Sequence, residues 1–213
     1  MTLRFQKASC VVVGTFNMYI LHPQWLAKHG IIAPDTEVEL QANFTQPGMR
    51  IVFPGDRVVW NVTPTRLVVD SQDREFNCGS RIADTLAVLP ETPLFAIGNN
   101  FRYQADLSEM THLSAAIRDC PRIDAPVSNQ HVVQRTFHVA VEQPDHETVN
   151  LQIALKEQQI ELACNVHRDV GKDQTPHKAA VTAARRFLDH RAACESLAHH
   201  FFGTSIDHGS DNT

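Results

Sequence analysis

The segment Val58-Val-Trp-Asn-Val-Thr-Pro-Thr-Arg-Leu-Val-Val-Asp70 alternates apolar and polar residues on both sides of Pro64. Such alternation is typical of a β-strand with one buried and one open face, because successive side chains point to opposite sides of a sheet. A turn at Pro64 and Thr65 suits the fixed φ of proline and places all the apolar side chains on one face. The segment therefore predicts a β-hairpin. Its apolar pairs across the turn are Val62 with Leu67 and Trp60 with Val69.

A second segment, Leu151-Gln-Ile-Ala-Leu-Lys-Glu-Gln-Gln-Ile-Glu-Leu-Ala163, shows the same pattern around a turn at Glu157 and Gln158. Each of its apolar positions lies 93 residues after an apolar position of the first hairpin. The corresponding positions are Val58 and Leu151, Trp60 and Ile153, Val62 and Leu155, Leu67 and Ile160, and Val69 and Leu162. This correspondence predicts that one folding unit occurs twice in the chain.

Similar elements are expected around each hairpin. Before the first hairpin the sequence predicts a strand at 10–21, a helix at 23–29 and a strand at 37–45, and after it a helix at 80–89. Before the second it predicts a strand at 94–104, a helix at 107–118 and a strand at 131–142, and after it a helix at 176–202. We therefore predict an α+β protein with two repeats, at 1–93 and 94–203, and a disordered tail at 204–213.

Two such repeats predict a curved, largely antiparallel sheet with helices on one face. This order of strand, helix, strands and helix resembles that of the TATA-binding-protein fold, which implies a saddle with an open polar sheet face. The likeness lies in element order alone, so no residue of that family is carried over. Two ferredoxin-like halves packed separately, or a helix-grip domain with its long last helix in the grip, are the alternative arrangements.

The composition is that of a globular protein, with 43% hydrophobic and 20% charged residues in a chain of 213. No apolar run approaches the roughly 20 residues that a membrane helix needs, so we expect no membrane association. The formal net charge of −5 and the lack of a Lys or Arg cluster disfavour non-specific binding to nucleic acid. The five cysteines are scattered, without Cys-x-x-Cys spacing, so we expect a cytoplasmic protein with reduced thiols.

Two groups of residues could carry chemistry, but a structural role explains each of them. On the predicted last helix the candidate ligand pairs project in different directions, so we predict no metal site. These pairs are His190 with Cys194 and Glu195 with His199. Cys78 precedes a predicted helix N-terminus, which favours a thiolate, but a buried thiol with Ser80 as the helix cap fits equally. We expect no cofactor, because the sequence has no phosphate-cradling loop or dinucleotide-binding motif.

The other face of the two hairpins, and of the strands beside them, is rich in amide, hydroxyl and imidazole groups. A merely solvated face usually carries Lys and Glu, whereas these groups recognise a ligand or a partner backbone by hydrogen bonding. A plain open sheet face is the alternative explanation. We predict a binding surface that comprises Asn61, Arg66, His138, Asn150, Gln152, Asn165 and His167.

We therefore expect a non-catalytic binding or assembly protein. It would dock a protein partner, or its own copy in an oligomer, through the polar face or a strand edge. Two other classes remain open. A nucleic-acid reader would use the same face with a basic rim around Arg66, Arg135 and Arg168. An enzyme or small-ligand binder would use a cleft between the repeats, near Asn17, Asn99, Asn100, His138 and His167.

Overall fold

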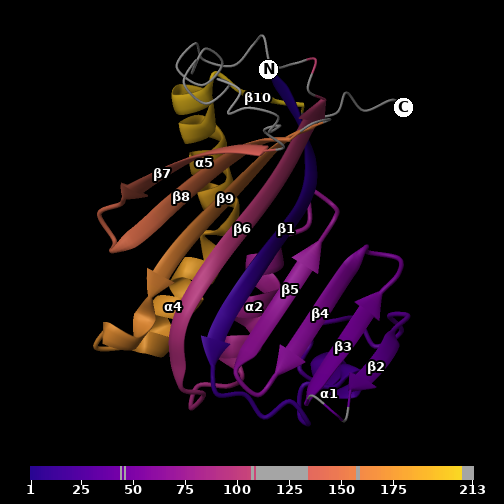
Figure 1. The fold of residues 1–213 in the computed structure, drawn as a ribbon. Coiled ribbons are helices and arrows are strands. Elements are labelled where there is room, and N and C mark those ends of the chain that lie inside the picture. Colours follow the sequence, from indigo (N-terminus) through magenta and orange to yellow (C-terminus); the bar gives the residue numbers. More distant parts are fainter. Residues whose placement is uncertain (44, 46, 107, 109–133, 157–158, 208–213) are drawn as a thin grey trace.

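The computed structural model describes the chain except for residues 44, 46, 107, 109–133, 157–158 and 208–213. The described residues form an α+β fold built on one large, open sheet of ten strands (Figure 1). Its strand order is β2-β3-β4-β5-β1-β6-β9-β8-β7, with every neighbouring pair antiparallel, and β10 pairs in parallel with β1.

The strands are β1 (Thr2–Gly14), β2 (Glu39–Asn43), β3 (Gly48–Phe53), β4 (Val58–Thr63), β5 (Arg66–Ser71), β6 (Leu94–Asp106), β7 (Gln134–Glu142), β8 (Glu147–Lys156), β9 (Gln159–Asp169) and β10 (Ser205–Ile206). The helices are α1 (Pro23–Lys28), α2 (Cys78–Ala87), α4 (Pro176–Arg185) and α5 (Phe187–Phe202), with a 3-10 turn, η2, at Val170–Lys172.

Both predicted hairpins are present in the sheet. Strands β4 and β5 pair with Val62 opposite Leu67. Strands β8 and β9 pair with Leu155 opposite Ile160, and the turn between them lies outside the described residues. In each hairpin the apolar positions are buried, and apart from Ala154 (5% exposed) they alternate with partly or fully exposed ones. The period-two pattern of the sequence therefore identified the buried face of both hairpins.

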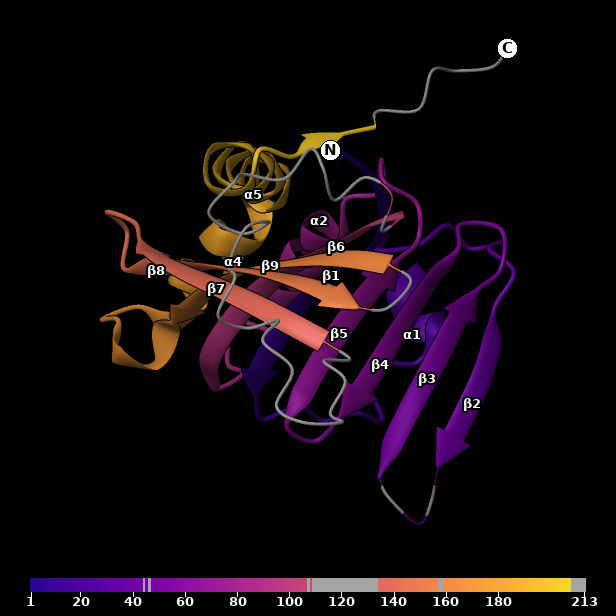
Figure 2. The ribbon, with the colours of Figure 1, turned by 45° about the horizontal axis from the view of Figure 1, so that its top comes forward.

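Helices α2, α4 and α5 cover one face of the sheet, and α1 lies on the same side near β3 and β4 (Figures 1 and 2). The core lies between these helices and the sheet, and it includes Trp60, Phe101, Tyr103 and Phe187, all at most 1% exposed. Among the described residues, no helix has both the length and the apolar character needed to cross a bilayer.

Several element boundaries differ from those expected. The sequence predicts a strand at 10–21, whereas β1 spans Thr2–Gly14. The chain leaves the sheet after Gly14, where Thr15 N donates to Pro93 O and Phe16 N donates to Pro64 O. Strand β3 was not predicted, because its sequence GMRIVF lies next to a segment rich in turn-forming residues.

The predicted helix at 176–202 is two helices, α4 and α5, because Arg186 has a ψ of 10°, far from the helical value of about −42°. The predicted tail also contains structure, since Ser205–Ile206 form β10 against β1. The predicted helix at 107–118 lies outside the described residues apart from Ser108.

Candidate binding face of the sheet

A row of side-chain hydrogen bonds crosses four central strands on the face of the sheet away from the helices. Asn150 Nδ2 donates to Asn165 Oδ1 (3.4 Å), and Asn165 Nδ2 donates to Asn100 Oδ1 (2.8 Å). Asn100 Nδ2 then donates to Ser9 Oγ (3.3 Å). These four residues are direct neighbours in the pairing of β8, β9, β6 and β1. We call them the polar ladder.

The polar ladder leaves hydrogen-bonding capacity directed outward. Each amide has two N–H donors and an oxygen with two lone pairs. In the ladder each of the three Nδ2 atoms donates one hydrogen bond to its neighbour. A second N–H on each of them therefore remains for a bound partner. Because the amides bond to one another, their planes are held in fixed orientations.

A hollow of about 430 Å³ lies over the polar ladder. Exposed side chains of Lys7, Arg102, His138 and Gln152 contribute to its lining. Lys7 Nζ lies 2.8 Å from Asp70 Oδ1, whereas Arg102 has no side-chain hydrogen bond or ion pair with any residue that the structure describes. Cationic and amide donors thus converge on one space, which suits a group rich in acceptor oxygens.

Four of the seven residues predicted for the binding surface line this hollow, namely His138, Asn150, Gln152 and Asn165. His167 is exposed in the next row, opposite Gly98 and Thr148. Asn61 and Arg66 lie on β4 and β5, beyond β1. Asn61 Nδ2 donates to Asp70 Oδ2 (3.2 Å), and Arg66 is exposed at the start of β5.

Sequence reasoning did not select Lys7, Ser9 or Arg102, and it assigned Asn100 to a cleft. The signal for Asn100 and Arg102 was present, because both alternate with the buried Phe101 along β6. Lys7 was harder to assign. A register shift between Phe5 and Lys7 interrupts the alternation and changes the face on which the preceding side chains lie.

The basic rim expected for a nucleic-acid reader does not form on this face. Arg168 and the buried Val166 are two residues apart in β9, so their side chains lie on the same, helix-covered side of the sheet. There Arg168 pairs with Asp173 at 3.1 Å. Arg135 lies on the same face of β7 as Phe137, which packs against the core. Of the three arginines, Arg66 alone lies on the polar face.

The residues expected to line a cleft between the repeats are separated by the sheet. Asn99 is buried on the helix-covered side, where Asn99 Nδ2 donates to Ala183 O (3.2 Å). The neighbouring Asn100 and His138 line the hollow on the opposite face. Asn17 is exposed in the connection that follows β1. These side chains therefore do not converge on one site.

Cys78 is buried at the start of α2, with its thiol 3.8 Å from Ala8 O. Burial, with a smaller effect of the Asp70 charge, raises the pKa of the Cys78 thiol to about 12. A reactive thiolate is therefore disfavoured at neutral pH. The helix cap is Asn77 and not Ser80, because Asn77 Oδ1 accepts a hydrogen bond from Ser80 N (2.9 Å).

The four side chains considered for a metal site have other neighbours. Glu195 pairs with Arg74 (3.3 Å) and accepts a hydrogen bond from Tyr103 Oη (2.8 Å). His199 Nδ1 lies 2.7 Å from Thr204 O, and Cys194 is buried. Across the described part of the chain, no group of three or more His, Cys, Asp or Glu side chains could hold a metal ion.

His190 belongs to a buried polar cluster at the junction of β6, β8 and α5. His190 Nε2 lies 3.1 Å from Glu147 Oε2, and His190 Nδ1 lies 2.7 Å from Asn99 Nδ2. The three residues are at most 4% exposed. Because the cluster is shielded from solvent and links a helix to two strands, we interpret it as structural.

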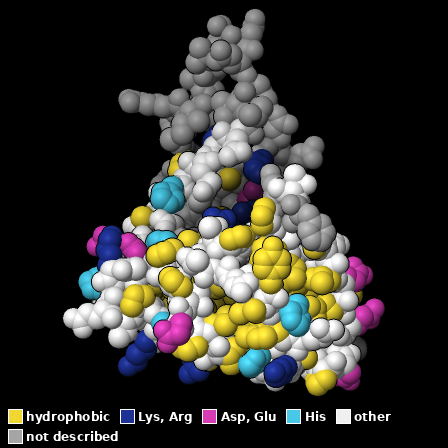
Figure 3. All heavy atoms as spheres, turned by 90° about the horizontal axis from the view of Figure 1, so that it is seen from below, with side chains coloured by type: hydrophobic (Ala, Val, Ile, Leu, Met, Phe, Trp, Pro, Cys, Tyr) yellow, Lys and Arg dark blue, Asp and Glu magenta, His cyan; other side chains and the backbone are white. Residues whose placement is uncertain are grey.

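Exposed hydrophobic side chains gather at the end of the molecule that lies at the bottom of Figure 1 (Figure 3). Tyr19, in the β1–α1 connection, is 78% exposed, and Phe95, near the start of β6, is 51% exposed. We call this surface the apolar end. Its apolar character alone does not identify a partner.

No known protein-family model matches this chain, and no curated protein matches it in sequence.

Proposed function

We propose that this is a non-catalytic binding protein that docks a protein partner against the polar ladder and the hollow above it. The polar ladder carries this proposal, because Ser9, Asn100, Asn165 and Asn150 are hydrogen-bonded side by side across four strands. Side chains that are already oriented lose little conformational freedom when they bind, so more of the interaction energy contributes to affinity. Amides are also the groups that pair best with a polypeptide backbone.

The dimensions of the ladder suit a short extended segment. Neighbouring strands lie about 4.8 Å apart, so four strands give a row about 15 Å long. An extended chain rises about 3.3 Å per residue, so four to five residues of a partner can lie along this row. Lys7 and Arg102 beside the row favour a partner with carbonyl or carboxylate oxygens.

The chemistry of the polar face favours binding over catalysis. Amide side chains neither titrate near neutral pH nor act as nucleophiles. The buried acid Glu147 and the buried thiol of Cys78 lie on the helix-covered side, away from the hollow. The buried acid Glu147 and the thiol of Cys78 are thus separated from the hollow, where His138 is the one imidazole among the described lining residues.

We also propose that the sheet arose by duplication of one strand-helix-strands-helix unit and forms a saddle like that of the TATA-binding protein. Outward from the central pair, the order is β1, β5, β4, β3 in one direction and β6, β9, β8, β7 in the other. Helix α2 follows the first set, and α4 and α5 follow the second. An experimental structure in which the β4–β5 and β8–β9 units failed to superpose would contradict the duplication.

The proposed function is tested by comparing partner binding in three forms of the protein. An Asn100→Ala, Asn165→Ala variant removes the centre of the polar ladder, and Tyr19→Ser alters the apolar end as a matched control. Quantitative affinity capture with the wild-type protein as bait first identifies proteins that bind it. Native mass spectrometry detects self-association. Dissociation constants are then measured with the purified partner or by dilution of the oligomer.

We expect the ladder variant to bind at least tenfold more weakly, which corresponds to about 1.4 kcal/mol, and Tyr19→Ser to bind like wild type. Circular dichroism and melting temperatures check that both variants fold. Loss of binding in Tyr19→Ser, with binding retained in the ladder variant, would place docking at the apolar end and refute the proposal. Salt-dependent binding of oligonucleotides in place of protein would favour the nucleic-acid reader.

A further inference from the structure

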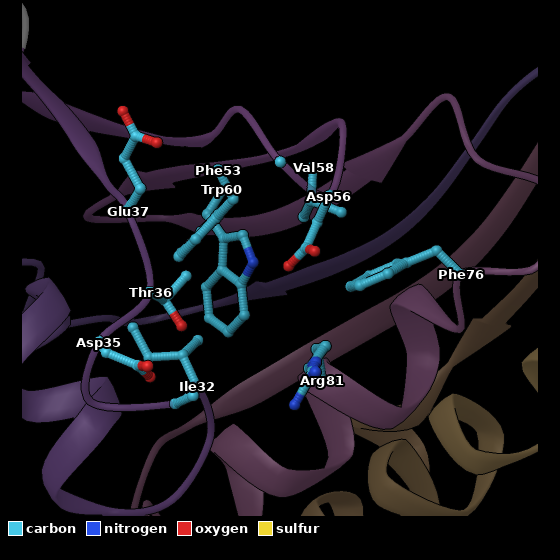
Figure 4. A pocket seen from close by; sticks show the side chains of 12 residues that line it. Ile32, Asp35, Thr36, Glu37, Phe53, Asp56, Val58, Trp60, Phe76 and Arg81 are labelled. Carbon is cyan, nitrogen blue, oxygen red and sulfur yellow. The ribbon is translucent and has the colours of Figure 1, made fainter.

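A second cavity, of about 430 Å³, opens on the helix-covered side of the sheet (Figure 4). It lies between the α1–β2 connection, the β3–β4 turn and the start of α2. Its volume falls within the range of about 300–1,000 Å³ that is usual for small-molecule sites. Its apolar lining comprises Ile32, Ala33, Phe53, Val58, Trp60 and Phe76. Because Trp60 and Asn61 are consecutive in β4, this cavity and the polar face lie on opposite sides of the sheet.

Trp60 presents an unused hydrogen-bond donor to this cavity. The residue is 1% exposed, yet its indole nitrogen has no hydrogen-bond partner among the residues that the structure describes. Figure 4 shows this nitrogen directed toward the space beside Asp56. This nitrogen is not among the buried side-chain atoms that lack a partner, so solvent reaches it through the cavity. An acceptor oxygen of a ligand can take the place of water at this N–H.

Asp56 and Arg81 bring opposite charges to the same space without pairing with each other (Figure 4). Arg81 Nη1 donates to Ile31 O (2.5 Å), and its guanidinium lies 5.8 Å from the centre of the Phe76 ring. These contacts hold the guanidinium in place and leave its other N–H groups as donors. Asp56 is exposed in the β3–β4 turn, with its carboxylate directed inward.

We propose that this cavity binds a free α-amino acid with an apolar side chain. Arg81 and the Trp60 indole N–H hold the carboxylate, Asp56 holds the ammonium group, and the apolar side chain packs against Phe53 and Phe76. The charges of Asp56 and Arg81 face one space but do not pair with each other. A zwitterion suits this arrangement, because its ammonium and carboxylate groups can pair with both residues at once. Asp35 and Glu37 also line the cavity. Their negative charge favours the ammonium group and opposes the carboxylate, so binding of the carboxylate depends on Arg81.

The test is a fluorescence titration that uses Trp60 as the probe. The chain has two tryptophans, Trp25 and Trp60, so a Trp25→Phe variant leaves the cavity residue as the sole indole. L-Leucine and L-methionine are titrated to about 10 mM, a limit that detects even weak binding. Leucine amide lacks the carboxylate and N-acetyl-leucine lacks the ammonium group. We expect saturable binding of the free amino acids and at least tenfold weaker binding of both analogues.

Two substitutions separate a specific site from a general apolar cavity. Asp56→Asn is expected to weaken L-leucine binding at least tenfold and to leave the weak binding of N-acetyl-leucine unchanged. Asp84→Asn removes an exposed carboxylate from the same helix as Arg81 and serves as the matched control. The proposal is overturned if neither free amino acid gives a saturable change, if leucine amide binds as tightly as leucine, or if Asp56→Asn binds like wild type.

Discussion

Glu147 is an acid that is 2% exposed, and its neighbours keep it ionised. His190 Nε2 and Arg186 Nη1 lie 3.1 Å and 3.4 Å from Glu147 Oε2. Burial alone would raise the pKa of Glu147. The contact with His190 and the positive charges of Arg186 and Arg168 outweigh burial, so the pKa of Glu147 lies below its ordinary value. The carboxylate thereby joins the start of β8 to α5.

This pKa shift predicts how stability depends on pH. A carboxyl group whose pKa is lower in the folded state stabilises the fold above its unfolded pKa of about 4.3, and this stabilisation is lost as the pH falls through the folded pKa. We expect Glu147→Gln to lower the free energy of unfolding by about 1.5–3 kcal/mol at neutral pH and by less in acid. Urea unfolding across this pH range measures the difference.

The control for this experiment is Glu142→Gln, at the exposed end of β7. Its effect on the free energy of unfolding should be small and nearly independent of pH. If Glu147→Gln lowered stability equally at neutral and acidic pH, the charge of Glu147 would not be what stabilises the fold.

At the scale of elements, the helix layer depends on a close approach between α2 and the α4–α5 pair. Gly79, at the second position of α2, lies against Ala184 and Phe187. A Cβ atom at position 79 would overlap with the Ala184 carbonyl oxygen and with Phe187 Cβ. Glycine is therefore required by packing here, although it is among the weakest helix formers.

Gly79→Ala consequently should destabilise the protein, contrary to helix propensity. The propensity gain of about 1 kcal/mol is expected to be outweighed by overpacking, for a net loss of about 1–3 kcal/mol in the free energy of unfolding. Gly55→Ala is the matched control, because a Cβ there meets no atom within 4 Å. Urea unfolding of both variants measures the change in the free energy of unfolding. A Gly79→Ala protein as stable as wild type would show that the helices can separate without cost.

At the scale of the whole molecule, the two ends of the described chain meet in the sheet. Strand β1 pairs with β5 from Ala8 onward, and β10 pairs with the earlier part of β1, at Thr2 and Leu3. Ser205 N donates to Met1 O (2.7 Å), and Asp207 N donates to Leu3 O (2.8 Å). Strand β10 thus covers an edge of the central strand that β5 does not reach (Figure 1).

Truncation after Gly203 should therefore loosen the start of β1. Each lost hydrogen bond contributes about 0.5–1.5 kcal/mol, so we expect the free energy of unfolding to fall by about 1–3 kcal/mol. Hydrogen exchange, followed by mass spectrometry, should be faster in the peptide that contains Thr2 to Phe5. Truncation after Asp207 serves as the control. Unchanged exchange in the shorter chain would show that β10 does not protect β1.

Much of the fold was predictable where the pattern is local. The pairing and the buried face of both hairpins, and the turn of the first, followed from alternation within 13 residues. The start of β1 and the break at Arg186 were not predictable in this way. Phe5 and Arg186 contact neighbours distant in sequence, namely Tyr103 on β6 and the acids Asp145 and Glu147, which a local pattern does not contain.

The sequence by itself determined which side chains of each strand share a polar face, because side-chain direction along a strand repeats every two residues. That was sufficient to place Asn150, Gln152 and Asn165 on one face of the sheet. Only the tertiary structure decided that these residues lie beside Asn100 and Ser9, because strand pairing joins segments separated by 65 and 91 residues. The same holds for the cavity of Trp60 and Arg81, whose walls come from a strand, a turn and a helix that no local pattern connects.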